Sequence, residues 1–197
     1  MVLNRSSAGP QNDENAQETT RTGGEALSRR EYPEACSVSP LIDVRRSAID
    51  GQGLFATEQI ESGTVLAAMG GTVLTDDEFR ALRVERYSAA AIGEDLNILH
   101  DADTPLQYGN HSCDSNMWMN DEITISARRV IPDGAEATID YALFTVNPTW
   151  RMECRCGAED CRGLVTGDDW RLRTVQARYR EHFSPFINLR IRRLAGS

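Results

Sequence analysis

Short alternations of apolar and polar residues dominate the middle of the chain. Residues 41–47 (LIDVRRS) alternate over a few positions, which is typical of a half-buried strand. Five further strand-prone runs, separated by Gly, Asp and Ser turn signals, are GQGLFA (51–56), TVLAAM (64–69), GTVLT (71–75), ITISARRVI (123–131) and the end of IPDGAEATIDY (131–141). This texture predicts many short strands.

Helical spacing replaces this alternation in two places. Residues 76–86 have an acidic first turn and then a helical set of side chains, which are Phe79, Leu82 and Arg86. Residues 168–183 begin with two Asp and then place four side chains on one helical face, namely Leu172, Val175, Tyr179 and Phe183. Ser184 and Pro185 can cap and start a second short helix. Strands first and helices last predict an α+β fold that is mostly β.

The N-terminal region has a different composition. Residues 1–36 are rich in Ser, Asn, Gln, Thr, Gly and Glu and poor in large apolar residues. Such a segment buries too little surface to offset its ordering entropy, so we expect a disordered tail. The chain has 197 residues, which fits one domain plus tails at about 100–200 residues per domain.

Charge and apolar content exclude several classes of protein. The net charge is −9, which argues against a protein that grips phosphate backbones, so we expect no direct binding to nucleic acid. All 21 basic residues are Arg, and without Lys the chain cannot form a phosphate-binding P-loop. No apolar run approaches the about 18 residues of a membrane helix, and no secretory signal is visible. We therefore expect no membrane partner.

The cysteines give the strongest chemical signal. Three of the five crowd into ECRCGAEDCRG as Cys154, Cys156 and Cys161, a clustering that indicates metal ligation in a reducing compartment inside the cell, the cytoplasm or a nucleus. A structural zinc ion takes four ligands, and Cys113 is the candidate for the fourth. Three reduced structural thiols remain an alternative interpretation. Cys36 stands apart in a polar stretch as a spare thiol.

Three further motifs are dense in glycine and polar residues, and each has an ordinary interpretation. GQGLFA has the letters of a dinucleotide-binding loop, but a turn at residues 61–63 follows too soon for the helix which that fold needs. A plain glycine turn and a glycine loop close to a ligand both stay open. YGNHSCDSN (108–116) also fits a solvent loop, and GAEATIDY (134–141) also fits a strand end with a buried Tyr.

In this order, the motifs resemble those of the SET-domain protein methyltransferases. GQGLFA resembles the family's first glycine motif, NHSCDSN its N-H-S-C-x-P-N, GAEATIDY its G-E-E-L-T-x-D-Y, and CRCGAEDCRG the post-SET C-x-C-x4-C zinc knuckle. The resemblance implies small sheets and a knot-like crossing of the NHSC segment with the final D-Y strand. It divides the chain after the tail into a SET domain (38–145), a zinc knuckle (150–166) and a C-terminal helical extension (167–197).

The resemblance also implies a cofactor, S-adenosyl-L-methionine, and a reaction, methyl transfer to the side-chain amine of a lysine in a protein. The residues implied to bind the cofactor are Gly51, Gln52 and Gly53 at its methionine part, Asn110 and His111 at its amino-acid and adenine ends, and Leu164, a looser match, at its adenine. Tyr141 matches the catalytic Tyr and Asp140 its strand partner. One structural Zn²⁺ per chain is implied, with the ligands Cys113, Cys154, Cys156 and Cys161.

The substrate channel is the part where the sequence departs from the family. Its candidate residues are Met69, Tyr87, Tyr108 and Ile139. Met69 and Ile139 stand where the family has aromatic residues, Ser115 replaces the usual Pro, and Gln107 replaces the usual Arg. These departures leave the channel walls open. They also motivate an alternative, a catalytically weak or silent SET-like module that binds proteins. A zinc-thiolate redox switch with Cys36 as resolving thiol is a third hypothesis.

The charge distribution suggests the kind of substrate. Residues 76–122 hold eleven Asp and Glu against three Arg, a local charge of −8, whereas residues 170–193 carry +6. In the family, the inserted region before the NHSC loop forms one wall of the peptide groove. We therefore expect a basic, lysine-containing protein or peptide substrate, although a solvated acidic surface is the plainer interpretation.

Overall fold

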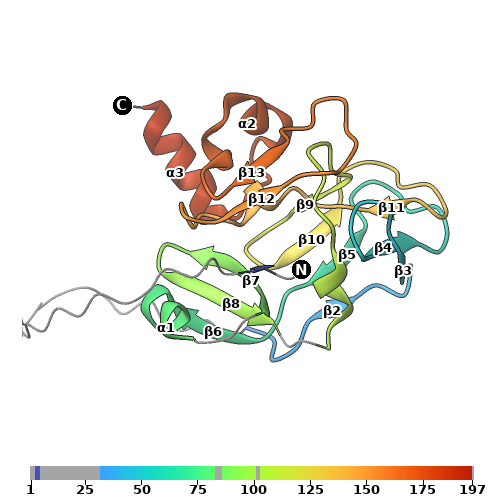
Figure 1. The fold of residues 1–197 in the computed structure, drawn as a ribbon, viewed down its shortest axis with the longest axis horizontal. Coiled ribbons are helices and arrows are strands. Elements are labelled where there is room, and N and C mark those ends of the chain that lie inside the picture. The colour runs from blue at the N-terminus through green and yellow to red at the C-terminus, as the bar shows by residue number, and fades with distance from the viewer. Residues whose placement is uncertain (1–2, 5–31, 83–85, 101–102, 197) are drawn as a thin grey trace, which may run out of the picture.

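The structure is a computed structural model that describes residues 3–4, 32–82, 86–100 and 103–196. Within them, short strands form four small antiparallel sheets (Figure 1). The first has the order β1 (Leu3–Asn4), β7 (Arg86–Gly93), β8 (Leu96–His100) and β6 (Thr72–Thr75). The second has the order β2 (Ser37–Val38), β5 (Val65–Ala68), β10 (Thr124–Ala127) and β9 (Met117–Met119). The third is β11 (Glu136–Ala137), β4 (Gln52–Ala56) and β3 (Ile42–Arg46), and the fourth is the hairpin of β12 (Arg151–Glu153) and β13 (Leu164–Thr166).

Helices make up the smaller part of the described chain. They are α1 (Asp76–Ala81), α2 (Arg173–Tyr179) and α3 (Pro185–Ala195), with 3₁₀ turns η1 (Pro105–Tyr108), η2 (Tyr141–Leu143) and η3 (Asp169–Arg171). The fold class is therefore α+β and mostly β, as the hydrophobic pattern predicts. Among the described residues, no helix has both the length and the apolar character needed to cross a bilayer.

Two predicted helices are wrong in extent. The first ends at Ala81, because Leu82 adopts an extended backbone (φ −63°, ψ 126°), and by Arg86 the chain is already in β7. The pairing of β7 with β8, with a bulge before Gly93, takes precedence over the helical spacing. The second breaks at Leu172, which is also extended, so that η3 and α2 replace one continuous helix.

Part of the predicted tail packs on the domain. The carbonyl oxygen of Pro33 accepts a hydrogen bond from Gly71 N at 2.8 Å. A Cβ atom on Gly70 would lie 2.1 Å from the carbonyl oxygen of Ala35, so only glycine permits this approach. Cys36 Sγ exchanges hydrogen bonds with Gly70 and lies 3.5 Å from Nδ1 of His100. Residues 1–2 and 5–31 of the predicted tail lie outside the described residues.

The segment before η2 crosses the loop that follows η1. Ile139 forms parallel bridges to both His111 and Met117, so the chain at 137–140 runs between two parts of one loop. Ile139 N donates to Asn110 O at 3.1 Å, and Ser112 N donates to Ile139 O at 3.3 Å. This arrangement is the knot-like crossing that the resemblance implies, and it places residues far apart in sequence beside one another.

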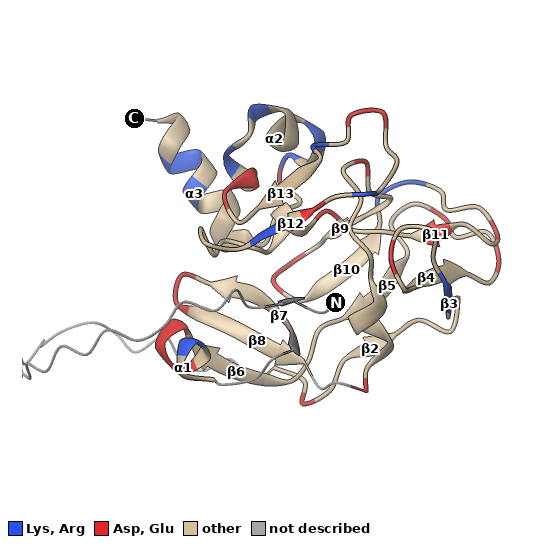
Figure 2. Cartoon of the chain, viewed as in Figure 1, with Lys and Arg blue, Asp and Glu red and all other residues tan. Residues whose placement is uncertain are grey.

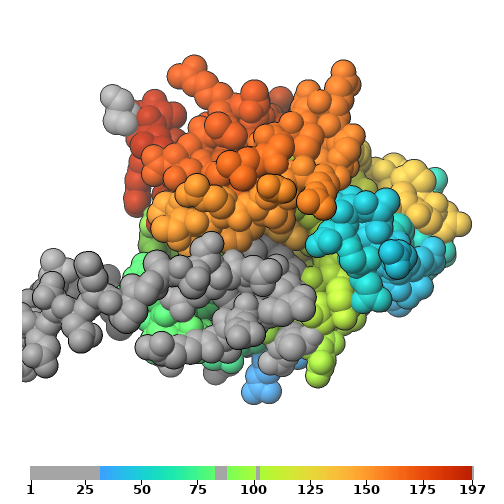
Figure 3. Space-filling view, in the orientation of Figure 1, coloured from blue at the N-terminus to red at the C-terminus, as the bar shows by residue number. Residues whose placement is uncertain are grey.

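The C-terminal third covers one side of the molecule. In the space-filling view the orange and red segments, which include β12, β13, α2 and α3, form a continuous band (Figure 3). Helix α3 contacts β7, and it buries Phe186 and Ile187. The extension is thus part of the packed core rather than an appendage.

Candidate functional site

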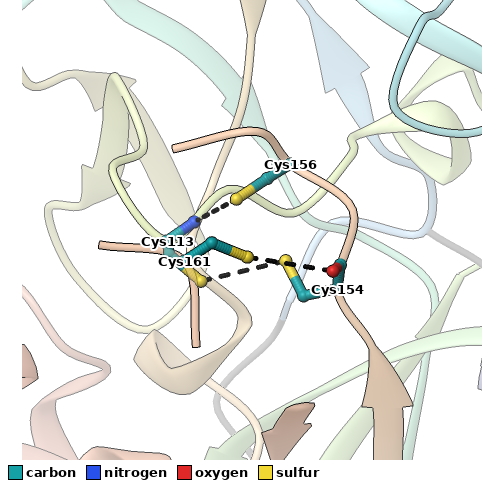
Figure 4. A group of neighbouring side chains, drawn as sticks. All are labelled: Cys113, Cys154, Cys156 and Cys161. Carbon is teal, nitrogen blue, oxygen red and sulfur yellow. Dashed lines mark hydrogen bonds between the residues drawn. The ribbon is translucent and has the colours of Figure 1, made fainter. Parts of the chain in front are cut away.

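Four cysteines meet where the loop before β9 approaches the β12–β13 hairpin (Figure 4). The loop supplies Cys113, the hairpin supplies Cys154, Cys156 and Cys161, and the four sulfur atoms lie within 4.8 Å of one another. The Sγ atoms of Cys113 and Cys154 are 3.8 Å apart. Tetrahedral thiolates with Zn–S bonds of about 2.3 Å would be separated by about 3.8 Å. The donor set therefore fits a four-thiolate zinc site.

Backbone N–H groups point at two of these sulfur atoms. Cys113 N donates to Cys156 Sγ and Arg162 N donates to Cys113 Sγ, each at 3.4 Å. Burial raises the pKa of Cys113 to about 11 and raises that of Cys154 as well. At Cys156 burial acts in the same direction, but the N–H groups of Cys113 and Ala158 outweigh it and lower the pKa to about 7. A bound cation would supply the charge that four thiolates need.

The helical extension holds the loop that carries Cys113. The hydroxyl of Tyr179, which is fully buried, lies 3.1 Å from Ser115 Oγ and accepts from Ser115 N at 3.3 Å. Arg178 donates to the Cys113 carbonyl oxygen and pairs with Asp160 at 2.7 Å. Ser115, at the position of the family's Pro, thus offers an N–H and a hydroxyl that Pro lacks.

Tyr141 lies in the crossing and is almost fully buried, with 7% of its surface exposed. Its hydroxyl donates to the carbonyl oxygen of Gly109 at 2.9 Å. Its ring packs edge-on against His111, with 5.1 Å between ring centroids, and lies 6.0 Å from the rings of Phe144 and Trp150. Burial, with a smaller contribution from Asp50, raises the pKa of Tyr141 well above its usual value. The hydroxyl therefore stays protonated at neutral pH.

His111 is fixed by its two ring nitrogens. Tyr141 N donates to Nδ1 at 3.1 Å, so this nitrogen carries no hydrogen, and the neutral ring holds its hydrogen on Nε2. Nε2 lies 3.4 Å from Cys113 Sγ. Burial lowers the pKa of His111 to about 4, against the opposing effect of Asp140. His111 thus connects the turn of Tyr141 to the cysteine cluster as a neutral ring.

The two positions of the GQG turn that hold glycine do so for different reasons. Gly51 has a positive φ of 47°, and nothing lies within 4 Å of the place where its Cβ would be. A Cβ on Gly53 would lie 2.1 Å from Glu136 Oε1 and 3.1 Å from Asn110 Nδ2. Asn110 Nδ2 donates to Gln52 O at 2.9 Å and to Glu136 Oε1 at 2.7 Å. Gly53 therefore allows close packing against the crossing, while Gly51 leaves the turn open.

A cleft of about 830 Å³ opens beside the crossing. Six of the predicted site residues line it: Gly51, Gln52, Tyr108, Asn110, His111 and Tyr141. Cys154 lines it as well, so the cysteine cluster forms part of its wall. The cleft unites the three motifs that the sequence presents separately.

Other predicted site residues lie elsewhere. Gly53 packs behind the turn, and Met69 and Ile139 are in the core at 2% and 3% exposure; neither lines the cleft, and Ile139 bridges to His111 in its wall. Leu164 is 48% exposed on β13. Tyr87 is placed in β7, but its side chain lies outside what the structure describes. The side chains of Met69 and Ile139 both belong to the hydrophobic core, and their assignment to the substrate channel stays a prediction.

Sequence reasoning missed much of the cleft wall. Asp50, Ser88, His100, Met152 and Arg155 also line it. Ser88 and His100 are opposite one another on β7 and β8, and nothing in the sequence marks these strands as a wall because their pairing is not visible in it. Of these residues, Asp50 could have been found from the sequence, because it directly precedes the GQG turn.

A second, smaller pocket lies behind Tyr141. It has a volume of about 130 Å³, and its lining includes Ala89, Ala90, Ala91, Phe144, Trp150 and, from α1, Asp76. Phe144 and Trp150 are the aromatic rings that flank Tyr141. Tyr141 thus faces the large cleft, and the aromatic residues packed on it face the small pocket.

The charges of residues 76–122 are partly neutralised within the chain. Figure 2 shows acidic residues on α1 and at the β7–β8 turn, and arginines along α2 and α3. Hydrogen bonds from Arg190 lower the pKa of Glu94. Hydrogen bonds from Arg129 and Arg128 lower the pKa of Asp114. Some of the acidic residues of the 76–122 segment are therefore neutralised by arginines of the same chain and do not face a partner as free charges.

Comparison with known protein families finds a match to the SET domain over residues 51–142. The matched segment begins at Gly51, contains the Asn110–Cys113 stretch and ends one residue after Tyr141. Cys154, Cys156 and Cys161 follow it.

Curated relatives cover a similar stretch. The chain is 26% identical over 155 residues to "Histone-lysine N-methyltransferase ash1" of Drosophila melanogaster, covering 72% of this chain and 7% of the relative. It is 33% identical over 137 residues to "Histone-lysine N-methyltransferase, H3 lysine-4 specific" of Cryptococcus neoformans, covering 61% and 9%. The chain thus spans less than a tenth of the length of either relative.

Solved structures give weaker similarities. The methyltransferase domain of human SETMAR aligns with a TM-score of 0.49 at 20% identity, covering 62% of this chain and 56% of that one. KRYPTONITE, in complex with mCHG DNA and SAH, aligns with a TM-score of 0.49 at 25% identity, covering 62% and 28%.

Proposed function

Since the chain contains a SET domain, we propose that it transfers methyl groups from S-adenosyl-L-methionine to the side-chain amine of lysine in a protein substrate. One observation carries this proposal. The knot-like crossing brings the Gly51 turn, Asn110, His111 and Tyr141 to one cleft. The names of the relatives above, which are histone-lysine N-methyltransferases, point to the same reaction.

The cleft fits the cofactor in size and in its polar groups. Its volume of about 830 Å³ lies within the range of about 300–1,000 Å³ that small-molecule sites occupy. The Gly51 turn leaves open space for a close approach to the backbone. Ser88 Oγ is buried in the cleft wall and has no hydrogen-bond partner among the described residues. We assign Gly51, Gln52, Asn110 and His111 to the cofactor, which supplies an electrophilic methyl group on a cationic sulfur.

Gly53 and Leu164 support this site from outside the cleft lining. Gly53 keeps Asn110 against the turn. Leu164 pairs in register with Glu153, which lines the cleft, so its exposed side chain is well placed to cover an adenine ring that enters there.

Tyr141 orients the amine rather than acting as a base. Its hydroxyl hydrogen is committed to Gly109 O, and its raised pKa keeps that hydrogen in place. The oxygen therefore offers lone pairs to an N–H group of the substrate amine. Holding the amine in this way aims its own lone pair in one direction, and alignment of this kind is a large source of rate.

The amine must lose its proton before transfer. A free lysine has a pKa near 10.4, so neutralising it near pH 7.4 costs about 4 kcal/mol. The small pocket is lined by the apolar side chains of Ala89–Ala91, Phe144 and Trp150 and also by polar groups, among them Asp76, Arg80 and Asn97. Apolar walls and a nearby cationic sulfur both lower the pKa of an ammonium group. No strong base is required from the protein.

We assign the four cysteines to one structural Zn²⁺ that ties the hairpin to the crossing. Such a centre needs reduced thiols, so we place the protein in a reducing compartment inside the cell. We propose a basic protein segment as substrate, since α1 sets Asp76 at the rim of the small pocket and Asp77, 95% exposed at its side chain, beside it in sequence. The net charge of −9 disfavours direct binding to nucleic acid.

The test is mass spectrometry of basic proteins, histones included, after incubation with isotopically labelled S-adenosyl-L-methionine. Label on a lysine side chain of a basic protein, absent with the Tyr141→Phe chain, is the expected result. The enzyme itself offers no lysine side chain, so label on it away from the N-terminal amine would mean that the acceptor is not lysine. Cofactor binding without transfer to any acceptor would instead favour the silent binding module.

A further inference from the structure

Arg162 links the cysteine cluster to the turn that carries Tyr141. Its backbone N–H donates to Cys113 Sγ at 3.4 Å. Its guanidinium donates two parallel hydrogen bonds to Asp140, of 2.8 and 2.7 Å. The Arg162 side chain is only 14% exposed and that of Asp140 is fully buried. One residue therefore touches both the metal-ligand set and the segment that ends in Tyr141.

Asp140 passes this contact on to Tyr141. The Oδ1 atom of Asp140 also accepts the backbone N–H of Ala142 at 3.0 Å and so caps η2, whose first residue is Tyr141. The same Oδ1 lies 3.6 Å from Nδ1 of His111, the atom that accepts the backbone N–H of Tyr141. The position of this carboxylate thus sets the start of the turn and, with it, the direction of the Tyr141 side chain.

The ion pair is suited to holding a fixed geometry. A buried carboxylate without its cationic partner is an uncompensated charge, which strongly disfavours any state in which the pair is broken. The planar fork of arginine fixes both oxygens, which a lysine ammonium cannot do. The Nε atom of Arg162 also lies 2.9 Å from Asp169 Oδ2 without forming a hydrogen bond, so a second carboxylate, from the extension, faces the guanidinium as an ion pair.

We propose that Arg162 is a positioning residue for Tyr141, acting through Asp140, so that the geometry at the reacting end of the cleft depends on a folded cysteine cluster. The proposal rests on the function proposed above. It assigns to the hairpin a part in the reaction as well as in stability. A displacement of about 1 Å at a reacting group can lower a rate by about 100-fold, so small movements of η2 would suffice.

The first experiment follows Tyr141 without any substrate. The zinc-loaded chain is labelled with ¹³C at the Cζ atoms of its five tyrosines, and the Tyr141 signal is the one missing from Tyr141→Phe. Arg162→Gln should shift or broaden that signal while the chain keeps one zinc. The matched control is Arg171→Gln, which removes an exposed arginine paired with Asp168 at 3.1 Å and should leave the Tyr141 signal unchanged.

If Arg162→Gln fails to fold, the pair variant Arg162→Gln with Asp140→Asn removes both charges and avoids an uncompensated one. It should fold and still shift the Tyr141 signal, because amide groups do not reproduce the two-point contact. An unchanged Tyr141 signal in whichever of the two variants folds would overturn the proposal. Neither outcome depends on finding the substrate.

The second experiment separates positioning from general stability. On an accepted substrate, Arg162→Gln should lower kcat at least about tenfold while the dissociation constant of the cofactor product changes less than about threefold. Placed in a Tyr141→Phe chain, the same substitution should lower the residual rate less than about twofold, since its effect runs through the missing hydroxyl. Equal losses in both backgrounds would show a merely structural role. If the wild-type chain methylates nothing, the proposed methyltransferase function is contradicted. The NMR signal of Tyr141 still decides whether Arg162 positions this residue.

Discussion

Two regions of the molecule are held together in different ways. We call the cysteine cluster with its crossing and hairpin the cysteine end, and helix α1 with the neighbouring β7–β8 turn the α1 end. At the cysteine end, buried groups from distant segments meet: Cys113 with the hairpin, Tyr179 with Ser115, and Arg162 with Asp140. On α1 itself the ion pairs are local and exposed, while Glu94 at the neighbouring β7–β8 turn pairs with the distant Arg190. Arg80 pairs with Asp76 and Asp77, and its side chain is 65% exposed.

This difference separates geometry from recognition. Buried, multiply bonded groups hold one arrangement, because breaking any link leaves an unpaired charge or donor. Exposed pairs contribute only about 0–1 kcal/mol each, and a charged partner or salt can replace them. We infer that the cysteine end fixes the reacting groups and that the α1 end adapts to the substrate. The predictions below test this contrast, from the largest expected effect to the smallest.

Loss of one cysteine ligand should have the largest effect. In Cys161→Ser the cluster loses a thiolate, and since structural zinc sites contribute about 10 kcal/mol or more, the hairpin should unfold and the chain should lose its zinc. Metal analysis and thermal unfolding measure both. The matched control is Cys36→Ser, which changes a cysteine outside the cluster and should retain one zinc per chain.

Two outcomes would weaken this picture. Full zinc in Cys161→Ser would mean that the cluster is not the metal site. Peroxide resistance gained in Cys36→Ser would favour the redox switch, because Cys36 would then act on the zinc thiolates. Its contacts with Gly70 and His100 give a structural reason for this thiol instead, so we expect no gain.

Removal of the Tyr141 hydroxyl should affect turnover alone. Tyr141→Phe keeps the ring contacts with His111 and Trp150 and loses the group that holds the amine. We expect kcat to fall by at least about 100-fold, as for loss of one oriented polar group in an active site. Calorimetry with the cofactor product should give an affinity within a few-fold of wild type. Turnover near the wild-type rate would contradict the role assigned to Tyr141.

Short-range patterns predicted several strands correctly and singled out three of the four cysteines that the structure brings together. The runs at 41–47 and 51–56 correspond to β3 and β4, because alternation and turn residues act over a few positions. The spacing of Cys154, Cys156 and Cys161 indicated a metal site by its chemistry alone, and the resemblance implied Cys113 as the fourth ligand.

Long-range pairing explains what the sequence could not predict. The β7–β8 hairpin and the walls formed by Ser88 and His100 depend on which strands pair. The guanidinium of Arg162 faces Asp140, 22 positions earlier, and nothing in the sequence around Arg162 indicates this partner. Contacts of this kind follow from the crossing as a whole, and no local pattern encodes them.

The hydrogen bonds of Tyr179 should have an intermediate effect on the cysteine end. Tyr179→Phe removes the hydroxyl from Ser115 and Cys113 while the buried ring stays. We expect a loss of about 1–2 kcal/mol in unfolding free energy, with faster release of zinc to a chelator. Ser115→Ala should lower the unfolding free energy less in the Tyr179→Phe chain than in the wild-type chain, because both substitutions break the same hydrogen bond. Additive losses would mean that the two residues act independently.

The smallest effect should be at the α1 end, where recognition depends on exposed charge. If Asp77 on α1 and Asp103, which follows the far end of β8, attract a basic substrate, reversing both to Arg should lower kcat/KM on a basic peptide about three- to tenfold at low salt and leave cofactor affinity unchanged. The same charge change at Asp133→Arg, in the turn before β11, should have less effect because that turn lies apart from the small pocket.

For the wild type, kcat/KM on the basic peptide should fall several-fold between about 50 and 300 mM salt, as the Debye length shortens from about 14 Å to about 6 Å. A neutral peptide should show little salt dependence. Equal rates on neutral and basic peptides at low salt would refute steering, and the exposed acids would then be a solvated surface whose pairs with Arg80 and Arg190 serve only the chain itself.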